Sequence, residues 1–183
     1  MLRWLSALIC WFSAALPGFA ASPVCEAEMA KAAASFGVPL GILYSVGLTE
    51  TGQRGLLDPY AMNIDGRAVR SVSLAEALGK FDQAIAHGAK LVDIGCMQIN
   101  QHWHGQDFGS VAEMFDVRRN VDYAAHFLRA LRVSEGSWTM AVARYNAGPD
   151  KPMAQRAYVC AVIRSMVASG SGGWTPQARA FCG

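Results

Sequence analysis

The chain has 183 residues, of which 52% are hydrophobic and 16% are charged, and its formal net charge is +2. This length suits one domain of ordinary size, and a hydrophobic fraction this high excludes an intrinsically disordered protein. The small net charge gives no electrostatic footprint for nucleic acid, so we expect no nucleic-acid partner.

The first 21 residues have the pattern of a secretory signal peptide. Arg3 supplies a positive charge, and an apolar stretch follows over residues 4–16. After Pro17-Gly18 comes the small pair Ala20-Ala21, and we expect cleavage near Ala20 or Ser22. The apolar stretch is shorter than the ~20 residues that a membrane-spanning helix needs. We therefore expect no stable membrane anchor, with an uncleaved anchor as the alternative, and we expect residues 22–183 to form one periplasmic domain.

Two helices are predicted next. The first has apolar residues at helical spacing, namely Met29, Ala33 and Phe36, and Gly37 ends it. Pro39 suits the first turn of a second helix that runs to about Thr51.

Glu50 is a charged residue on a hydrophobic stripe of this second helix. Leu43, Val46 and Glu50 are spaced by three and four, which places the carboxylate beside two buried aliphatic side chains. Burial and the negative carboxyl end of a helix both disfavour the ionised form, so both raise the pKa, as a general acid near neutral pH requires. The alternative is a helix-end glutamate that simply reaches solvent.

The middle of the chain is predicted to contain a small β element. Residues 63–66, Asn-Ile-Asp-Gly, suit a hairpin tip, and residues 93–100 suit an irregular or short-strand segment. Between them, Ser73 and Glu76 form a capping-box pattern ahead of a helix that ends near Gly88.

Further helices are predicted after residue 110. Ser110 with Glu113 repeats the capping pattern before a short helix, and Asp116 can cap a longer one. That longer helix has one apolar face, made of Val121, Ala124, Leu128 and Leu131. Ser137 precedes another helical stripe, made of Trp138, Ala141, Val142 and Tyr145, and a final helix begins near Pro152. The predicted class is mainly α with a small β element.

Export to an oxidising compartment predicts disulfides. Loss of the signal peptide leaves an even number of cysteines: Cys25, Cys96, Cys160 and Cys182. Three pairings are possible, and we favour Cys160 with Cys182, which are close in sequence and flank a Gly/Ser-rich turn. A zinc site is the competing use, but the chain has no C-x-x-C pair, so we expect no metal. His102-Trp103-His104 is more typical of a surface or sugar-facing feature than of a metal site.

Three separated segments resemble the signature blocks of the soluble lytic transglycosylase family, in the expected order. They are Gly47-Leu48-Thr49-Glu50-Thr51, then Asp93-Ile94-Gly95-Cys96-Met97-Gln98-Ile99-Asn100, then Ala143-Arg144-Tyr145-Asn146-Ala147-Gly148. The resemblance spans roughly residues 25–148. The wider sequence pattern is similar to that of the small single-domain members that accompany secretion, conjugation or flagellar machines. It implies a lysozyme-like helical fold, with a small β-hairpin element lining the cleft.

The resemblance also implies roles for individual residues. Glu50 would be the catalytic acid/base, and the substrate-binding residues would be Thr51, Met97, Gln98, Tyr145 and Asn146. Asn146 is suited to hold the sugar's N-acetyl group. The alternatives are core packing for Met97 and Tyr145 and a helix-end role for Asn146. The chain departs from the usual family pattern at Thr51 (Ser), Cys96 (Leu) and Arg144 (Ala).

The reaction that the resemblance implies needs one acid and no cofactor. Glu50 protonates the bond between N-acetylmuramic acid and N-acetylglucosamine, then takes the proton of the muramyl C6 hydroxyl, which closes a 1,6-anhydro ring. The expected partners are peptidoglycan glycan strands and a secretion, conjugation or flagellar apparatus, and the expected state is a monomer.

Other functions stay open. A hydrolytic muramidase would use an aspartate to place a water, although Asp58, Asp65 and Asp93 all lie in turn-like contexts where capping is the usual role. An inactive glycan-binding or scaffold subunit of a secretion or conjugation system is kept open by Cys96 and Arg144. The weakest alternative is a thiol hydrolase that uses Cys96 with a histidine.

Overall fold

The structure is a computed structural model that describes residues 23–52 and 55–183, so the predicted signal peptide at 1–21 lies outside the described residues. The helices are α1 (Val24–Phe36), α2 (Leu40–Glu50), α3 (Leu74–Ala86), α4 (Gln101–His104), α5 (Val111–Phe115), α6 (Val117–Glu135), α7 (Trp138–Asn146), α8 (Pro152–Ala168) and α9 (Pro176–Cys182). The strands are β1 (Met62–Ile64), β2 (Arg67–Val69), β3 (Val92–Ile94) and β4 (Ile99–Asn100). The predicted class, mainly helical with a small β element, is confirmed.

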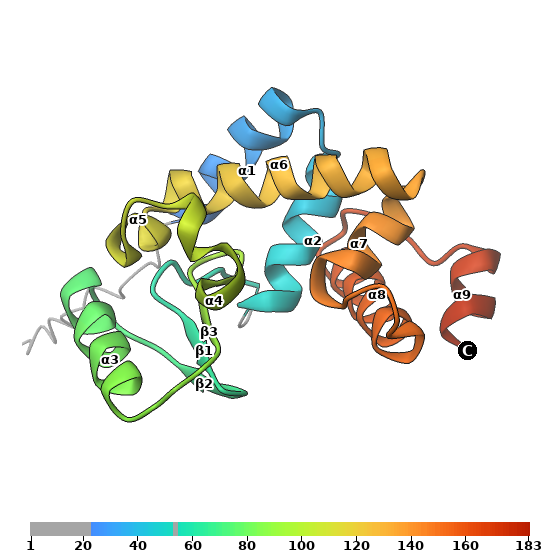
Figure 1. Ribbon diagram of the computed structural model, residues 1–183. Coiled ribbons are helices and arrows are strands. Elements are labelled where there is room, and N and C mark those ends of the chain that lie inside the picture. Colours follow the sequence, from blue (N-terminus) through green and yellow to red (C-terminus); the bar gives the residue numbers. More distant parts are fainter. Residues whose placement is uncertain (1–22, 53–54) are drawn as a thin grey trace, which may run out of the picture.

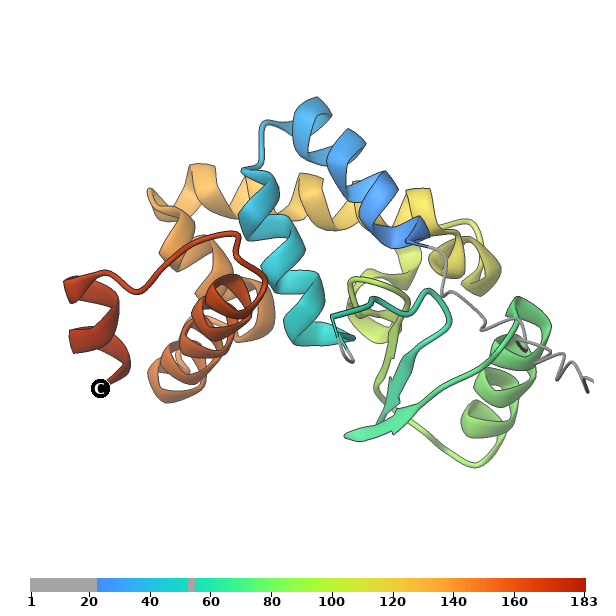
Figure 2. The ribbon, with the colours of Figure 1, turned by 180° about the vertical axis from the view of Figure 1, so that it is seen from behind.

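The molecule has a helical side and a sheet side that meet around α2. Helices α1 and α6 lie together across one edge, and α2 runs from that edge toward the middle (Figure 1). Seen from behind, α7 and α8 lie on one side of α2, and the sheet with α3 lies on the other (Figure 2). Helix α2 packs against both α1 and α8, and its carboxyl end lies beside the sheet.

The sheet is antiparallel, with the strand order β2-β1-β3-β4. Ile64 pairs with Arg67, so a two-residue turn of Asp65 and Gly66 joins β1 to β2. Both residues have positive φ, 47° and 87°, as the favoured hairpin turn with Asp-Gly requires. The hairpin tip predicted at residues 63–66 is therefore confirmed.

Amino-terminal caps are present at the three predicted positions and also at Ser137. The side chains of Ser73, Ser110, Asp116 and Ser137 each accept a hydrogen bond from the backbone N–H three residues further on. In both predicted capping boxes the glutamate accepts a hydrogen bond from the residue before the serine. Glu76 accepts from the N–H of Val72 at 2.9 Å, and Glu113 accepts from the N–H of Gly109 at 2.6 Å. These caps fix where α3, α5, α6 and α7 begin.

The core includes residues of α1, α2 and α6 and extends into β1, β3 and the β3–β4 loop. Its fully buried side chains include Met29, Leu43, Val46, Val121 and Leu128. Gly47 on α2 allows this close packing, because a Cβ atom there would lie 2.5 Å from Cε of Met29. The turn that leads to Glu50 is therefore pressed directly against α1. Among the residues that the structure describes, no helix has both the length and the apolar composition needed to cross a membrane.

Two disulfides are present among the residues that the structure describes. Cys160 is bonded to Cys182, the pairing favoured from the sequence, and Cys25 is bonded to Cys96. The first joins α8 to α9, a seven-residue helix beyond the predicted final helix. The sequence prediction missed α9 because so short a segment has little periodicity, and its position depends on the disulfide. The second joins the start of α1 to the loop between β3 and β4.

Candidate active site

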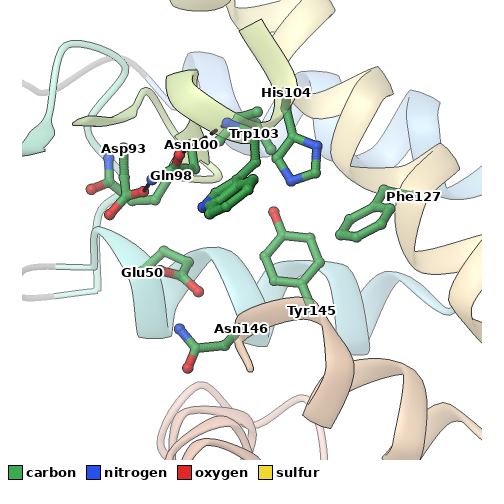
Figure 3. Close-up of a pocket in the computed structure, with 10 residues that line it drawn as sticks. Glu50, Asp93, Gln98, Asn100, Trp103, His104, Phe127, Tyr145 and Asn146 are labelled. Carbon is green, nitrogen blue, oxygen red and sulfur yellow. Dashed lines mark hydrogen bonds between the residues drawn. The ribbon is translucent and has the colours of Figure 1, made fainter. Parts of the chain in front are cut away.

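A pocket of about 230 Å³ lies at the carboxyl end of α2, between the sheet and α7 (Figure 3). It is lined by residues of all three sequence blocks and by residues of α4 and α6: Glu50, Asp93, Gln98, Ile99, Asn100, Trp103, His104, Phe127, Tyr145 and Asn146. This volume is below the ~300–1,000 Å³ of pockets that enclose a whole drug-sized ligand. The pocket therefore suits a part of an extended ligand.

Glu50 is the last residue of α2, and its carboxyl group is partly buried in this pocket. The residues one and two turns earlier on the same stripe, Val46 and Leu43, are fully buried, as predicted. Burial raises the pKa of Glu50 to about 7; a hydrogen bond from Tyr158 opposes this rise, and the negative charge of Asp93 adds to it. An acid with this pKa can both give and take a proton near neutral pH.

Tyr158 on α8 is a site residue that the sequence analysis missed. Its hydroxyl donates a hydrogen bond to Oε1 of Glu50, and its side chain is only 8% exposed. Burial and the nearby Glu50 charge raise the pKa of the Tyr158 hydroxyl well above its ordinary value, so it stays a donor. The signal was present in the sequence, because a tyrosine on the buried stripe of a helix needs a polar partner for its hydroxyl.

Asp93 lies in a strand and not in the turn that the sequence predicted. It lies in β3 between the buried residues Val92 and Ile94, and the alternation of side chains along a strand turns it to the opposite face, toward the pocket. Its carboxylate accepts a hydrogen bond from Nδ2 of Asn100 at 2.6 Å. Burial raises the pKa of Asp93, and the Asn100 bond opposes the rise. The prediction that Asp93 is a turn-capping residue is wrong, and the pocket contains two carboxyl groups.

The other two aspartates have the capping roles expected of them. Asp58 accepts a hydrogen bond from the N–H of Tyr60 at 2.9 Å, and Asp65 accepts one from the N–H of Leu91 at 2.9 Å. Neither lines the pocket.

The loop between β3 and β4 is held by Asn120 of α6, which is fully buried. Its Oδ1 accepts from the N–H of Met97 at 2.9 Å, and its Nδ2 donates to the carbonyl of Ile94 at 2.9 Å. Gly95 has a φ of 80°, and a Cβ atom there would lie 2.7 Å from Nδ2 of Asn120. Asn120 and Gly95 therefore fix the loop that brings Gln98 to the pocket.

Gln98 lines the pocket, as the family resemblance implied. It is one of two non-glycine residues with positive φ among those described, at 47°. Its amide nitrogen donates to the carbonyls of Ala61 at 3.2 Å and Gly95 at 3.0 Å. These two bonds orient the side chain along the wall of the pocket.

Thr51 and Met97 do not line the pocket, and their predicted contact with substrate stays a prediction. Thr51 is 5% exposed, and its hydroxyl donates to the carbonyl of Cys96 at 3.1 Å. Met97 is fully buried in the core, which was the alternative reading of this residue. Both residues connect the end of α2 to the β3–β4 loop.

Tyr145 and Asn146 lie at the end of α7 and line the pocket, as predicted. The Tyr145 hydroxyl donates to the carbonyl of Met97 at 2.8 Å, which joins the third sequence block to the second. Asn146 is exposed, so its amide is available to a ligand. In Figure 3 the amide of Asn146 lies beside Glu50, and the Tyr145 hydroxyl points toward Trp103 and His104.

The two other departures from the family pattern lie outside the pocket lining. The Arg144 guanidinium pairs with Glu135 at 3.2 Å. Cys96 is 1% exposed and bonded to Cys25, which removes the thiol that a Cys96 hydrolase would need. In the ranges 23–52 and 55–183, no three His, Cys, Asp or Glu side chains are grouped so that they could hold a metal ion.

Comparisons with known proteins fit this geometry. A family model described as "Transglycosylase SLT domain" matches residues 29–162, which is more than half of the chain. The matched range includes every residue that lines the pocket, and also Tyr158. Searches of the curated proteins and of the solved structures found no match.

Proposed function

The chain belongs to the transglycosylase SLT domain family, and from this premise we propose that it is a peptidoglycan lytic transglycosylase with Glu50 as its catalytic acid/base. The observation that carries the proposal is the partly buried Glu50 carboxyl group in the pocket, with its pKa raised to about 7. The proposed substrate bond is the β-1,4 link from N-acetylmuramic acid to N-acetylglucosamine, and the proposed product carries a 1,6-anhydro muramyl end.

In the first step, protonated Glu50 gives its proton to the glycosidic oxygen while the bond from that oxygen to the muramyl C1 breaks. The substrate's own N-acetyl oxygen assists at C1, and the exposed amide of Asn146 is suited to hold that N-acetyl group. Glu50 is left as a carboxylate, which the hydrogen bond from Tyr158 stabilises.

In the second step, the Glu50 carboxylate takes the proton of the muramyl C6 hydroxyl. The C6 oxygen forms a bond to C1, the N-acetyl oxygen leaves C1, and the 1,6-anhydro ring closes. Glu50 is protonated again, no water is consumed and no cofactor takes part. One carboxyl group with a pKa near neutral serves both steps.

A hydrolytic muramidase is the second candidate, and Asp93 is the observation that favours it. Most glycoside hydrolases use a pair of carboxyl groups that flank the glycosidic bond. The second group activates a water or attacks the sugar. Asp93 lines the same pocket as Glu50. Against this role, the Asp93 carboxylate already accepts a hydrogen bond from Asn100, which occupies one of its oxygens.

We also propose that the protein works in the periplasm, as a monomer, and opens the cell wall for an envelope-spanning machine. Two disulfides support an oxidising compartment. Cys96 and Arg144 both lie outside the pocket lining, which weakens the case for an inactive scaffold subunit.

Mass spectrometry of the fragments that residues 22–183 release from purified cell walls tests the reaction type. We expect 1,6-anhydro muramyl ends from the wild type and from Asp93→Asn, because the proposed mechanism needs one carboxyl group. Fragments with reducing ends only, together with complete loss of activity in Asp93→Asn, would establish the muramidase. Absence of any fragment, together with a blank zymogram, would favour the scaffold subunit.

A further inference from the structure

Trp103 of α4 presents an indole ring at the pocket with 64% of its surface exposed. Figure 3 shows this ring on one side of Glu50 and the amide of Asn146 on the other. A tryptophan side chain is large and apolar, and its burial usually stabilises a fold. The exposed indole beside a proposed catalytic acid therefore leaves apolar surface in water that a bound ligand could cover.

The other tryptophans in residues 23–52 and 55–183 differ from Trp103. Trp138 and Trp174 are partly buried, and each has an arginine guanidinium over its ring, with 5.9 Å from Arg132 and 5.6 Å from Arg179. The ring neighbour recorded for Trp103 is His102, which stands at 85° to it with 4.5 Å between centroids. This is an edge contact, so it limits the movement of the indole without stacking upon it.

Two hydrogen-bonded connections hold α4 in place. Oδ1 of Asn100 accepts from the backbone N–H of Trp103 at 3.2 Å. The side-chain amide of the same Asn100 donates to Asp93 at 2.6 Å. At the other end, Nδ1 of His104 lies 2.8 Å from the hydroxyl of Tyr123, which donates to Asp107 at 2.8 Å. The backbone that carries the indole is thereby held in place before any ligand arrives, so binding orders little of α4.

His104 and Tyr123 place no positive charge beside the indole. The one proton of the Tyr123 hydroxyl goes to Asp107, so the Tyr123 oxygen accepts from Nδ1–H of His104. Burial lowers the pKa of His104, with the Asp107 charge opposing, which keeps the imidazole uncharged near neutral pH. A flat, uncharged aromatic surface matches the C–H face of a pyranose ring.

We propose that Trp103 is a stacking platform for the N-acetylglucosamine ring that adjoins the bond cleaved at Glu50, on the side away from Asn146. This inference rests on the proposed function, which gives Asn146 the N-acetyl group of the muramyl sugar. The muramyl ring carries a lactyl peptide at C3, whereas the N-acetylglucosamine ring has no such branch to lift it from a flat surface. Trp103 then selects the sugar that occupies the leaving side of the pocket.

The first test is kinetic and compares Trp103→Ala with Trp174→Ala, a matched loss of an indole outside the pocket. On soluble glycan strands, we expect Trp103→Ala to raise KM about tenfold and to leave kcat within about twofold, as the loss of one stacking contact predicts. Trp103→Tyr should recover most of the loss. Unchanged melting temperatures would show that α4 is still folded.

The second test measures binding without catalysis. In residues 22–183 carrying Trp138→Phe and Trp174→Phe, Trp103 is the remaining tryptophan, and its emission reports on its own surroundings. A β-1,4-linked N-acetylglucosamine tetramer should shift this emission to shorter wavelength in a saturable manner.

The outcomes separate the two proposals. An active wild type with an unchanged KM in Trp103→Ala would overturn the role of Trp103 and leave the proposed function standing. A saturable shift of Trp103 emission in a protein that cleaves no glycan would support the platform and overturn the proposed activity. A protein that neither cleaves glycan nor shows the shift would contradict both.

Discussion

Replacing Glu50 with glutamine should stabilise the fold above neutral pH. The amide has nearly the same shape, and its oxygen can still accept the hydrogen bond from Tyr158. Burial raises the pKa of Glu50 from 4.5 to about 7, which corresponds to about 3 kcal/mol of differential free energy between the protonated and ionised forms. This is a large part of the 5–15 kcal/mol that usually separates folded from unfolded states.

The pH window follows from the direction of this shift. Below pH 4.5 the Glu50 carboxyl is protonated in both the folded and the unfolded state, so it contributes no pH dependence. Between 4.5 and about 7 the unfolded chain releases the proton while the folded protein keeps it, so the wild type loses stability as the pH rises. Glutamine does not titrate. The stability advantage of Glu50→Gln should therefore grow by about 3 kcal/mol from pH 4 to pH 8.

Urea denaturation of both proteins at several pH values between 4 and 8 measures this difference. Taking the difference between the two proteins removes the contribution of most other titrating groups, and any fixed effect of the amide on packing shifts all points equally. An advantage that stays constant with pH, or one that shrinks as the pH rises, would refute the claim that the fold holds Glu50 in an unfavourable ionised state.

Three further predictions follow from the neighbours of Glu50 and from the disulfides. Asp93→Asn removes a charge that raises the pKa of Glu50, and Tyr158→Phe removes a hydrogen bond that lowers it. Because Glu50 must start protonated, the alkaline limb of the pH–rate profile should move to lower pH in Asp93→Asn and to higher pH in Tyr158→Phe; shifts in the same direction would contradict this account of the pKa. Asn146→Ala should lower turnover with little change in melting temperature, because the side chain is exposed; an unfolded variant that keeps its activity per folded molecule would make Asn146 a structural cap. Peptide mapping without reduction should find both disulfides, and loss of the one between α8 and α9 should cost roughly 3 kcal/mol of stability while sparing the active site; free thiols at its two positions in periplasmic protein would contradict the pairing.

Local patterns predicted most of the helices and the position of the acid. Capping residues such as Ser73 and Ser137 act within one turn, so the sequence alone reveals them. The stripe of Leu43, Val46 and Glu50 likewise depends on helical spacing, and the structure buries the two aliphatic residues as that spacing requires. The Asp-Gly pair at 65–66 encodes its turn through its own backbone preferences.

The features that the sequence did not predict depend on contacts between distant segments. Tyr158 reaches Glu50 across 108 positions of the chain. Asp93 was assigned to a turn because a three-residue strand has too little alternation to be recognised, and its neighbours in the sheet decide which face it occupies. Thr51 and Met97 are adjacent to pocket residues in sequence, yet the packing of α2 against the β3–β4 loop buries both. Proximity in a motif therefore did not distinguish residues that line the pocket from residues that support it.

The rate at which Glu50→Gln releases 1,6-anhydro muropeptides from purified cell walls, compared with the wild type, tests the central claim most directly. General acid catalysis contributes ~10²–10⁴ in rate, so the variant, which keeps the shape of the side chain but has no proton to transfer, should be at least about 100-fold slower. Release of anhydro muropeptides at the wild-type rate by folded Glu50→Gln would contradict the assignment of Glu50 as the catalytic acid/base.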